Sequence, residues 1–267
     1  ASFAASFFSK PALISIVGED FPKEHIELLK KRSIDLEGLE IRGKTFHWEG
    51  YYELDMNEAK TKKTELNSLA DFKVEVPEKY KDVKYVFLAN IDPEQQLEAL
   101  NQINKPDLIV MDTMNFWISS KQKQLMEVIK KVDILLLNDG EARQLFKTIS
   151  LVKAANEALS LGPKAVIIKK GEHGALLFTR NKHFSAPGYP LENIKDPTGC
   201  GDCFGGGFMG YLAKTKDLSE SSFRKAVIYG SVLASYNAED FGLNRLKSLE
   251  MKDIESRYKE FEEIRLF

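Results

Sequence analysis

The chain is 267 residues long and 43% hydrophobic, which is enough to bury a large core as a single domain over residues 1–267. Its formal net charge is −2 and its basic residues are dispersed, so neither a nucleic acid nor a membrane is expected as a partner. No apolar run in the sequence approaches the ~20 residues that a transmembrane helix needs. The 2 cysteines suit a reducing compartment better than a disulfide scaffold, and we therefore expect a cytoplasmic protein.

Short runs rich in Val, Ile and Leu alternate along the chain with segments that carry apolar residues at helical spacing. The runs predict strands buried on both faces, at Ala12–Val17, Lys84–Ala89, Asp107–Asp112, Asp133–Asn138 and Ala165–Lys169. The segments between them predict helices at Lys23–Arg32, Glu94–Asn101, Lys121–Lys130, Glu141–Phe146 and Val152–Leu161. Further on, the pattern predicts an antiparallel pair at Gly174–Thr179 and Lys182–Ala186, followed by a mostly helical last third. This alternation is typical of an α/β fold with a doubly wound, mainly parallel sheet flanked by helices.

One segment, Thr45–Leu54, alternates in a way that does not fit the central sheet. Its apolar side chains share one face, and they are Phe46, Trp48, Tyr52 and Leu54. A half-exposed strand between helices predicts a small β-lid inserted at residues 43–70. Three interpretations stay open for the aromatic face: packing of an edge hairpin on the body, closure over a substrate, or a homodimer interface.

The glycine-rich turn in Asp196–Gly207 is the most informative stretch of the sequence. A helix that begins after Gly199 and Gly201 presents free backbone N–H groups and the positive end of its dipole, which together attract an anion. Asp202 would repel a phosphate there unless it accepts the proton of an attacking hydroxyl. The plainer alternative is a helix-packing seam in which Asp202 is an ordinary acid of the first helical turn.

This turn resembles the C-terminal signature of the ribokinase-like (PfkB) carbohydrate kinases, usually Asp-Thr-x-Gly-Ala-Gly-Asp. The corresponding residues are Asp196-Pro197-Thr198-Gly199-Cys200-Gly201-Asp202, with Pro197 in place of the usual Thr and Cys200 in place of the usual Ala. The resemblance extends over essentially the whole chain and implies a ribokinase-like fold and an ATP-dependent kinase that phosphorylates a hydroxyl of a sugar or nucleoside. It implies that Gly199, Cys200 and Gly201 supply the amides of the anion hole and that Asp202 is the catalytic base.

Other segments occur in the order that the family has them. Asn138-Asp139-Gly140-Glu141 resembles the family's Asn-x-x-Glu element, which implies that Asn138 and Glu141 serve the nucleotide site, with Glu141 holding Mg²⁺ through water. The same two residues also fit a plain capping box at a helix start. Activation by a monovalent cation occurs in relatives and stays open here.

Two further segments imply nucleotide contacts by the same resemblance. The turn Lys169–Gly174 is similar to one that flanks the nucleotide, which implies roles for Lys169, Gly171 and Gly174. The segment ending in Asn237 resembles one that lies beside the adenine. The alternatives are a plain hairpin turn and an ordinary small-residue helix.

Substrate contacts are expected beyond the carboxyl ends of the parallel strands. Asn90, Asp112 and Asn115 follow predicted strands there and fit hydrogen bonds to sugar hydroxyls. Asp112, Asn115 and Trp117 resemble the Asp-x-Asn-x-x-x-Trp pattern of some hexose kinases of the family, although their spacing is tighter. Trp117 also fits a core aromatic. From the lid, His47 and Trp48 are expected to close over the substrate and exclude water.

Other functions remain as alternatives. One is a vitamin-alcohol kinase of the same superfamily, acting on a pyridoxal-like or hydroxymethylpyrimidine-like alcohol. Another is a catalytically silent ligand-binding protein. A third is a thiol switch, because Cys200 and Cys203 form a C-x-x-C pair at a helix start, where a low-pKa Cys200 would be sensitive to oxidation.

The start of the chain departs from the family pattern. Family members begin with a strand bearing a substrate-binding Asp and a Gly-Gly turn, and then a helix. Ala1–Phe8 resembles that helix. We therefore expect the natural sequence to begin upstream of Ala1.

Overall fold

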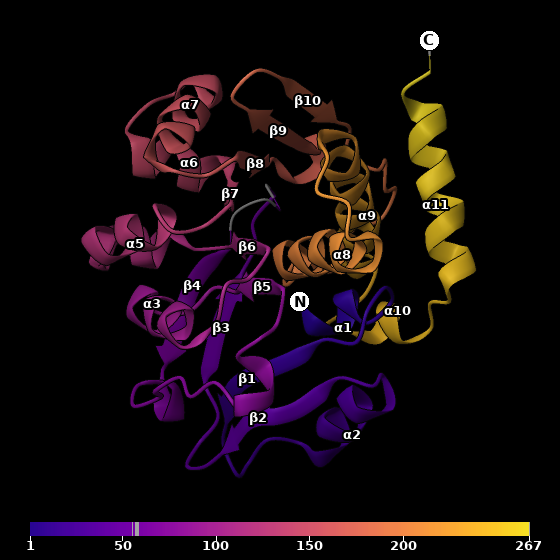
Figure 1. The fold of residues 1–267 in the computed structure, drawn as a ribbon. Coiled ribbons are helices and arrows are strands. Elements are labelled where there is room, and N and C mark those ends of the chain that lie inside the picture. The colour runs from indigo at the N-terminus through magenta and orange to yellow at the C-terminus, as the bar shows by residue number, and fades with distance from the viewer. Residues whose placement is uncertain (55, 57–58, 267) are drawn as a thin grey trace.

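A central six-stranded sheet forms the body of the protein in this computed structural model, which describes residues 1–54, 56 and 59–266. The strand order is β10-β9-β8-β7-β6-β5 (Figure 1). The parallel strands are β5 (Tyr85–Leu88), β6 (Leu108–Met111), β7 (Ile134–Asn138) and β8 (Ala165–Lys169). The antiparallel strands are β9 (Ala175–Thr179) and β10 (His183–Ala186). The mainly parallel sheet is therefore confirmed, together with the four predicted strands between Lys84 and Lys169.

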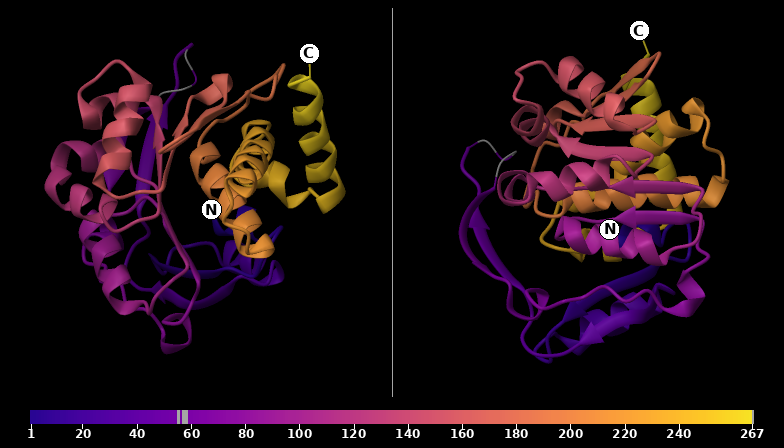
Figure 2. Two further views of the ribbon diagram at one scale, coloured as in Figure 1. Left: turned by 45° about the horizontal axis from the view of Figure 1, so that its top comes forward. Right: turned by 60° about the vertical axis from the view of Figure 1, so that its left-hand side comes forward.

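Helices cover both faces of this sheet (Figure 2, left). One face carries α3 (Pro93–Gln102), α4 (Asn115–Ser120), α5 (Gln122–Ile129), α6 (Asp139–Phe146) and α7 (Leu151–Leu161). The other face carries α1 (Ser2–Ala5), α8 (Cys200–Thr215), α9 (Glu220–Ala238), α10 (Asn244–Lys247) and α11 (Met251–Ile264). The short 3₁₀ helices are η1 (Asn67–Leu69), η2 (Glu78–Tyr80) and η3 (Gly171–His173). In the part of the chain that is described, no helix combines the length and the apolar character needed to cross a membrane.

The apolar runs of the sequence become strands because both faces of each strand are buried. In β7, Ile134 and Leu136 pack in the core beneath α8 and α9, whereas Leu135 and Leu137 pack beneath α5, α6 and α7. All four side chains are fully buried. Since neighbouring residues of a strand face opposite sides, two cores require an uninterrupted apolar run.

A smaller part of the chain forms two separate two-stranded sheets. In one, β1 (Ala12–Val17) pairs in parallel with β2 (Asp35–Ile41), beside α2 (Lys23–Lys31). The prediction that Ala12–Val17 belongs to the central sheet is therefore wrong. Only Ile16 of this strand is buried, in a small core built around Phe72, Val74, Val76 and Tyr80. β2 is not evident from the sequence, because three acidic residues and Gly38 interrupt its apolar positions.

The other small sheet is the antiparallel hairpin of β3 (His47–Tyr51) and β4 (Lys60–Glu65), which projects as an arm (Figure 2, right). It lies within the predicted lid insertion of residues 43–70. Trp48 lies over Gly50 of its own strand and donates from Nε1 to Thr61 Oγ1 at 3.1 Å. Phe46 and Leu54, expected on the covered face with Trp48, are both exposed.

Glycines allow α8 to pack against its neighbours almost backbone to backbone. A Cβ atom built on Gly205 would lie 2.5 Å from the ring of Phe87 in β5. One built on Gly230 of α9 would lie 2.8 Å from the carbonyl oxygen of Phe204 in α8. Both distances are shorter than a van der Waals contact, so the close approach of α8 to β5 and to α9 requires glycine at these positions.

We expect Gly230→Ala to lower the free energy of unfolding by about 1–3 kcal/mol, because the added methyl group meets a backbone oxygen that cannot rotate away. Urea denaturation of this variant and of Ser231→Ala would measure the effect. Ser231, the next residue of the same helix, is half-buried, and we expect its change to stay within about 0.5 kcal/mol. Equal effects of the two changes would contradict this account of the packing.

Candidate active site

Three neighbouring strands of the central sheet end beside one another and bring their C-terminal residues together. Asp112 follows β6, Asn138 ends β7 and Lys169 ends β8, with Asn138 and Lys169 paired directly across the sheet. The carboxyl ends of parallel strands form the usual ligand-binding edge of an α/β sheet. The structure therefore brings together, at this edge, residues that lie far apart in the sequence.

Asp112 and Lys169 form a buried ion pair at this edge. Lys169 Nζ lies 3.1 Å from Oδ1 and 2.9 Å from Oδ2 of Asp112. The side chains are 10% (Asp112) and 16% (Lys169) exposed. Burial opposes the positive charge of Lys169, but Asp112 and Glu141 more than offset it and raise the pKa of the ammonium. The pairing was not expected from the sequence, which assigned Asp112 to a sugar hydroxyl and Lys169 to the nucleotide.

The N-terminus of α8 lies against this ion pair. A Cβ atom built on Gly201 would lie 3.2 Å from Lys169 Nζ and 4.0 Å from Asp112 Oδ2. Gly199 is the N-cap residue, with a φ of +83° that favours glycine, and it offers no side chain to cap the helix. Among the residues described, the amides of Gly201 and Asp202 have no hydrogen-bond acceptor. The first turn of α8 therefore has the free donors that an anion site requires.

Asp202 stands exposed in this first turn. Its position beside the uncapped amides is the one that the sequence predicts for a base acting next to a bound phosphoryl group. Cys200 begins the helix at the centre of the turn, and its Sγ atom lies 3.4 Å from the carbonyl oxygen of Ala234 in α9. Its side chain is therefore directed toward α9.

The turn is held from behind by Asn237, which is 2% exposed. Asn237 Nδ2 donates to the carbonyl oxygen of Thr198 at 2.8 Å, and its Oδ1 accepts from Cys203 Sγ at 3.2 Å. In the loop before this turn, Lys195 Nζ lies 3.0 Å from Asp240 Oδ1 and forms an ion pair with it. The expected adenine contact by Asn237 does not agree with this placement, because both ends of its amide are engaged by the turn and by α8.

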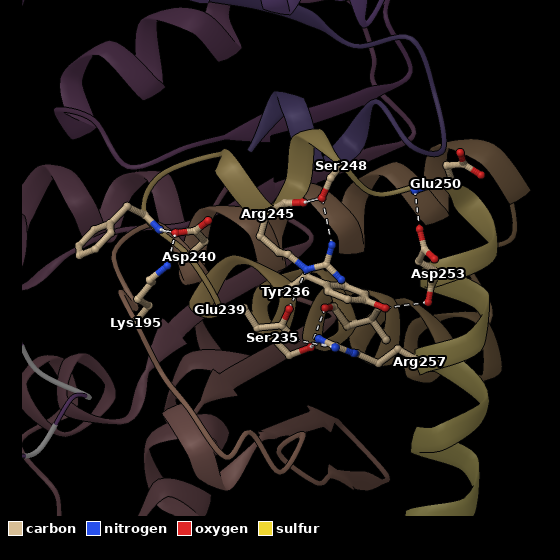
Figure 3. Close-up of polar contacts among 12 residues, drawn as sticks. Lys195, Ser235, Tyr236, Glu239, Asp240, Arg245, Ser248, Glu250, Asp253 and Arg257 are labelled. Atoms are coloured by element: carbon tan, nitrogen blue, oxygen red, sulfur yellow. Dashed lines mark hydrogen bonds and ion pairs between the residues drawn. The ribbon is translucent and has the colours of Figure 1, made fainter.

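The end of α9 beyond Asn237 is anchored to the C-terminal helix by the polar cluster in Figure 3. Glu239 accepts hydrogen bonds from Arg245 Nε at 2.8 Å and from Arg257 Nη2 at 2.6 Å. The Arg257 guanidinium lies 3.4 Å from the ring centroid of Tyr236. Sequence reasoning missed Arg257, because nothing in the pattern of α11 distinguishes it from the exposed basic residues around it.

Asn138 and Glu141 form a capping box at the start of α6. Glu141 Oε2 accepts from the Asn138 amide at 2.7 Å, and Asn138 Oδ1 accepts from the Glu141 amide at 2.7 Å. Burial raises the pKa of Glu141 to about 7. Within the described chain, no hydrogen bond reaches the second carboxylate oxygen of Glu141, and no set of three His, Cys, Asp or Glu side chains is arranged to hold a metal ion. Glu141 thus has one oxygen in the cap and one oxygen free of protein partners.

The turn after Lys169 has geometric reasons for its glycines. Gly171 begins η3 at a φ of +55°, and Gly174 follows it at a φ of +81°. A Cβ atom on Gly174 would lie 2.1 Å from the carbonyl oxygen of Ala186. The interpretation as a plain glycine-requiring turn therefore accounts for Gly174 without a nucleotide.

The predicted substrate residues lie at two separate places. Asn90 Oδ1 accepts from Trp117 Nε1 at 3.0 Å, which ties the end of β5 to α4, and Asn115 at the start of α4 is exposed. His47 is exposed on the hairpin, where Trp48 bonds across to β4.

Tyr52, which follows β3 in the hairpin segment, reaches the glycine-rich turn; the sequence placed it on the face of Trp48 without giving it a role. Its Oη lies 3.2 Å from Thr198 Oγ1. Burial raises the pKa of Tyr52, so its hydroxyl stays protonated and able to donate. This contact joins the hairpin to the turn that precedes α8.

The alternative of a low-pKa thiol at Cys200 is contradicted by the structure. Both cysteines are free thiols, and burial raises the pKa of Cys200 to about 11 and that of Cys203 to about 12. A buried thiol that stays protonated is a poor nucleophile toward oxidants. The structure therefore gives no support to a thiol switch at this turn.

We expect Glu141→Gln to become more stable relative to the unchanged protein as the pH rises from about 5 to about 7. The pKa of Glu141 is about 7 in the folded state, above its ordinary value of 4.5. Its contribution to stability is therefore complete below about pH 4.5 and is lost as the pH rises through about 7. Urea unfolding at several pH values without divalent ions should show a relative gain of about 1–3 kcal/mol. The exposed Glu172→Gln is the control, and a gain independent of pH would contradict the assignment.

Comparison with known proteins identifies the family. Residues 1–248 match the pfkB family carbohydrate kinases. A cytidine kinase of Thermococcus kodakarensis is 31% identical over 226 residues, covering 82% of this chain and 80% of that protein. A nucleoside kinase of Methanocaldococcus jannaschii is 25% identical over 161 residues, covering 60% of this chain and 51% of that protein.

Solved structures agree on the fold. The crystal structure of the Methanocaldococcus jannaschii nucleoside kinase, described as an archaeal member of the ribokinase family, has a TM-score of 0.78 at 20% identity, covering 97% of this chain and 84% of that one. An Escherichia coli protein described as a candidate ribokinase II, in complex with ATP and Mg²⁺, has a TM-score of 0.78 at 21% identity, covering 97% and 86%. On its sequence match and its architecture, the chain belongs to the pfkB family of carbohydrate kinases and has the ribokinase fold.

Proposed function

We propose that this protein is an ATP-dependent kinase that transfers the γ-phosphoryl group to a hydroxyl of a nucleoside or sugar. The observation that carries the proposal is the uncapped N-terminus of α8, with Asp202 in its first turn and free amides beside it. A helix start of this kind binds a phosphoryl group, and the adjacent carboxylate accepts a proton. The family membership supports the same reaction.

Each residue of the turn has a separate task in the proposed reaction. Asp202 takes the proton of the acceptor hydroxyl as that oxygen forms its bond to the γ-phosphorus. The bond between the γ-phosphorus and the bridging oxygen breaks, and ADP leaves with that oxygen. The amides of Gly199, Gly201 and Asp202, which have no acceptor among the described residues, stabilise the charge on the transferred group. The Cys200 amide, expected from the sequence to join them, donates instead to the carbonyl oxygen of Pro197 at 3.1 Å. Asn237 keeps the turn in place through its bond to Thr198.

The residues at the strand ends fit a magnesium ion held mainly by phosphate oxygens and water. Bound Mg²⁺ would neutralise charge on the phosphates of ATP. Glu141 offers one carboxylate oxygen free of protein partners, which suits contact through water. The absence of a three-ligand protein cluster among the described residues agrees with a site completed by the nucleotide. A similar solved structure is a complex with ATP and Mg²⁺.

The acceptor side is proposed to lie between the strand ends and the hairpin of residues 43–70, which acts as the lid. Asn90 and Asn115 remain candidates for hydroxyl contacts, with His47 and Trp48 as lid contacts. Asp112 is engaged by Lys169 and is therefore less available to a sugar. The similarity to a cytidine kinase supports a nucleoside acceptor as the first to test. The cytoplasmic location stays a prediction, and a homodimer through the lid and monovalent-cation dependence stay open.

We expect Asp202→Asn to retain ATP binding and to lose turnover by a factor of about 10² or more, because the amide cannot take the hydroxyl proton. Product mass and ADP release would be followed with Mg-ATP and a panel of nucleosides, sugars and vitamin alcohols. Asp217→Asn, beyond the C-terminal end of α8, is the matched control.

Three outcomes would decide between the candidate functions. A phosphorylated product lost in Asp202→Asn would support the kinase and name its acceptor class, including a vitamin alcohol. Near-normal turnover in Asp202→Asn would remove Asp202 as the base. ATP binding without any product would favour a silent ligand-binding protein.

A further inference from the structure

The buried ion pair of Asp112 and Lys169 is the feature that the proposed reaction leaves unexplained. Taking two charges out of water is costly, and a buried pair is often no more stabilising than apolar side chains of similar size. Here the pair lies directly beneath the uncapped start of α8, at Gly201. A costly arrangement at this position calls for a role in the reaction.

We propose that Lys169 is a catalytic residue whose ammonium contacts an oxygen of the transferring phosphoryl group, and that Asp112 is the positioning residue that holds it there. This inference rests on the proposed kinase function. It gives Lys169 a place at the transferred group itself, whereas the sequence implied a place beside the nucleotide.

The first support is the distance to the anion turn. A methyl group on Gly201 would stand 3.2 Å from Lys169 Nζ, so the ammonium borders the residue that precedes Asp202. Because Gly201 has no side chain, nothing of that residue separates the ammonium from the amides of the turn. A phosphoryl group bound by these amides is then within reach of a lysine ammonium.

The second support is the number of donors. A lysine ammonium has three N–H groups. Lys169 uses at most two of them on Oδ1 and Oδ2 of Asp112, and no other acceptor in the described chain bonds to it. One donor is therefore free for a ligand oxygen while the ion pair stays intact.

The third support is the balance of charge. Three carboxylates, those of Asp112, Glu141 and Asp202, act on the Lys169 ammonium and favour its charged form. In phosphoryl transfer, negative charge spreads over the oxygens of the moving group. A cation that is held in place and largely buried offsets that charge without having to reorganise. Asp112 holds the Lys169 ammonium in place through contacts with both of its carboxylate oxygens.

The alternative is a structural tie between β6 and β8, and four variants separate the two roles. They are Lys169→Met, Asp112→Asn, the double variant and Lys170→Met as a matched control for the loss of one positive charge. The double variant removes both members of the pair and leaves no unpaired charge, so it is expected to fold even if Lys169→Met does not. Urea unfolding checks this for each.

For the kinase reaction, we expect Lys169→Met and the double variant to lose kcat by about 10²–10³-fold, the size seen when one donor to a developing charge is removed. Asp112→Asn should lose less, because the ammonium remains, and Lys170→Met should stay near the unchanged protein. ADP affinity should change little. Aluminium fluoride, added with Mg²⁺, mimics the transferring phosphoryl group and should tighten the binding of ADP to the unchanged protein. This tightening should be absent in the variants that lack Lys169.

The outcomes are distinguishable. A folded double variant that recovers the turnover of Asp112→Asn, or that keeps the aluminium fluoride effect, would overturn the inference and leave the kinase function standing. If the unchanged protein phosphorylates nothing in the acceptor panel and shows no aluminium fluoride effect, the proposed function fails, and the inference fails with it.

Discussion

The close packing of α8 on the sheet and on α9 is the constraint on which the rest of the site depends. Gly205 and Gly230 have no side chains, and any side chain at these positions would hold α8 away from β5 and α9. The helix can then lie low enough for its first turn to touch Lys169 at the end of β8. A larger separation would leave the amides of the turn and the strand ends as two unrelated surfaces. The site is therefore a consequence of packing as much as of the residues within it.

This packing places a group that favours an anion beside a group that favours a cation. The uncapped start of α8 favours an anion, whereas Asp112, Glu141 and Asp202 leave more carboxylates than Lys169 can balance. Neither need is met by the described protein alone. A nucleotide phosphate accompanied by a divalent cation meets both, which is a physical reason for the proposed function that does not depend on family resemblance.

The sequence predicted what depends on local pattern and missed what depends on distant partners. Strands β5 to β8 follow from apolar runs, because two cores bury both faces of each strand. Ala12–Val17 has the same kind of run, yet it packs on a small separate core, and no local signal distinguishes the two cases. Asp112 and Lys169 are 57 residues apart. Their pairing follows only from the order of strands in the sheet.

The glycine-rich turn shows how a motif can be recognised while its support remains hidden. Its glycines and Asp202 can be read from the sequence. The support from Asn237 cannot, because this residue lies in α9, later in the chain, and no local pattern marks it as a partner of the turn. Tyr52 reaches the same turn from the hairpin through the hydroxyl of Thr198. With the Thr198 carbonyl fixed by Asn237 and its amide fixed by Asp196, only its hydroxyl is free to respond to the lid. The proposed lid thus touches the turn at the one polar group of Thr198 that the body of the protein leaves available, so its position and the order of the anion site are linked by a direct contact.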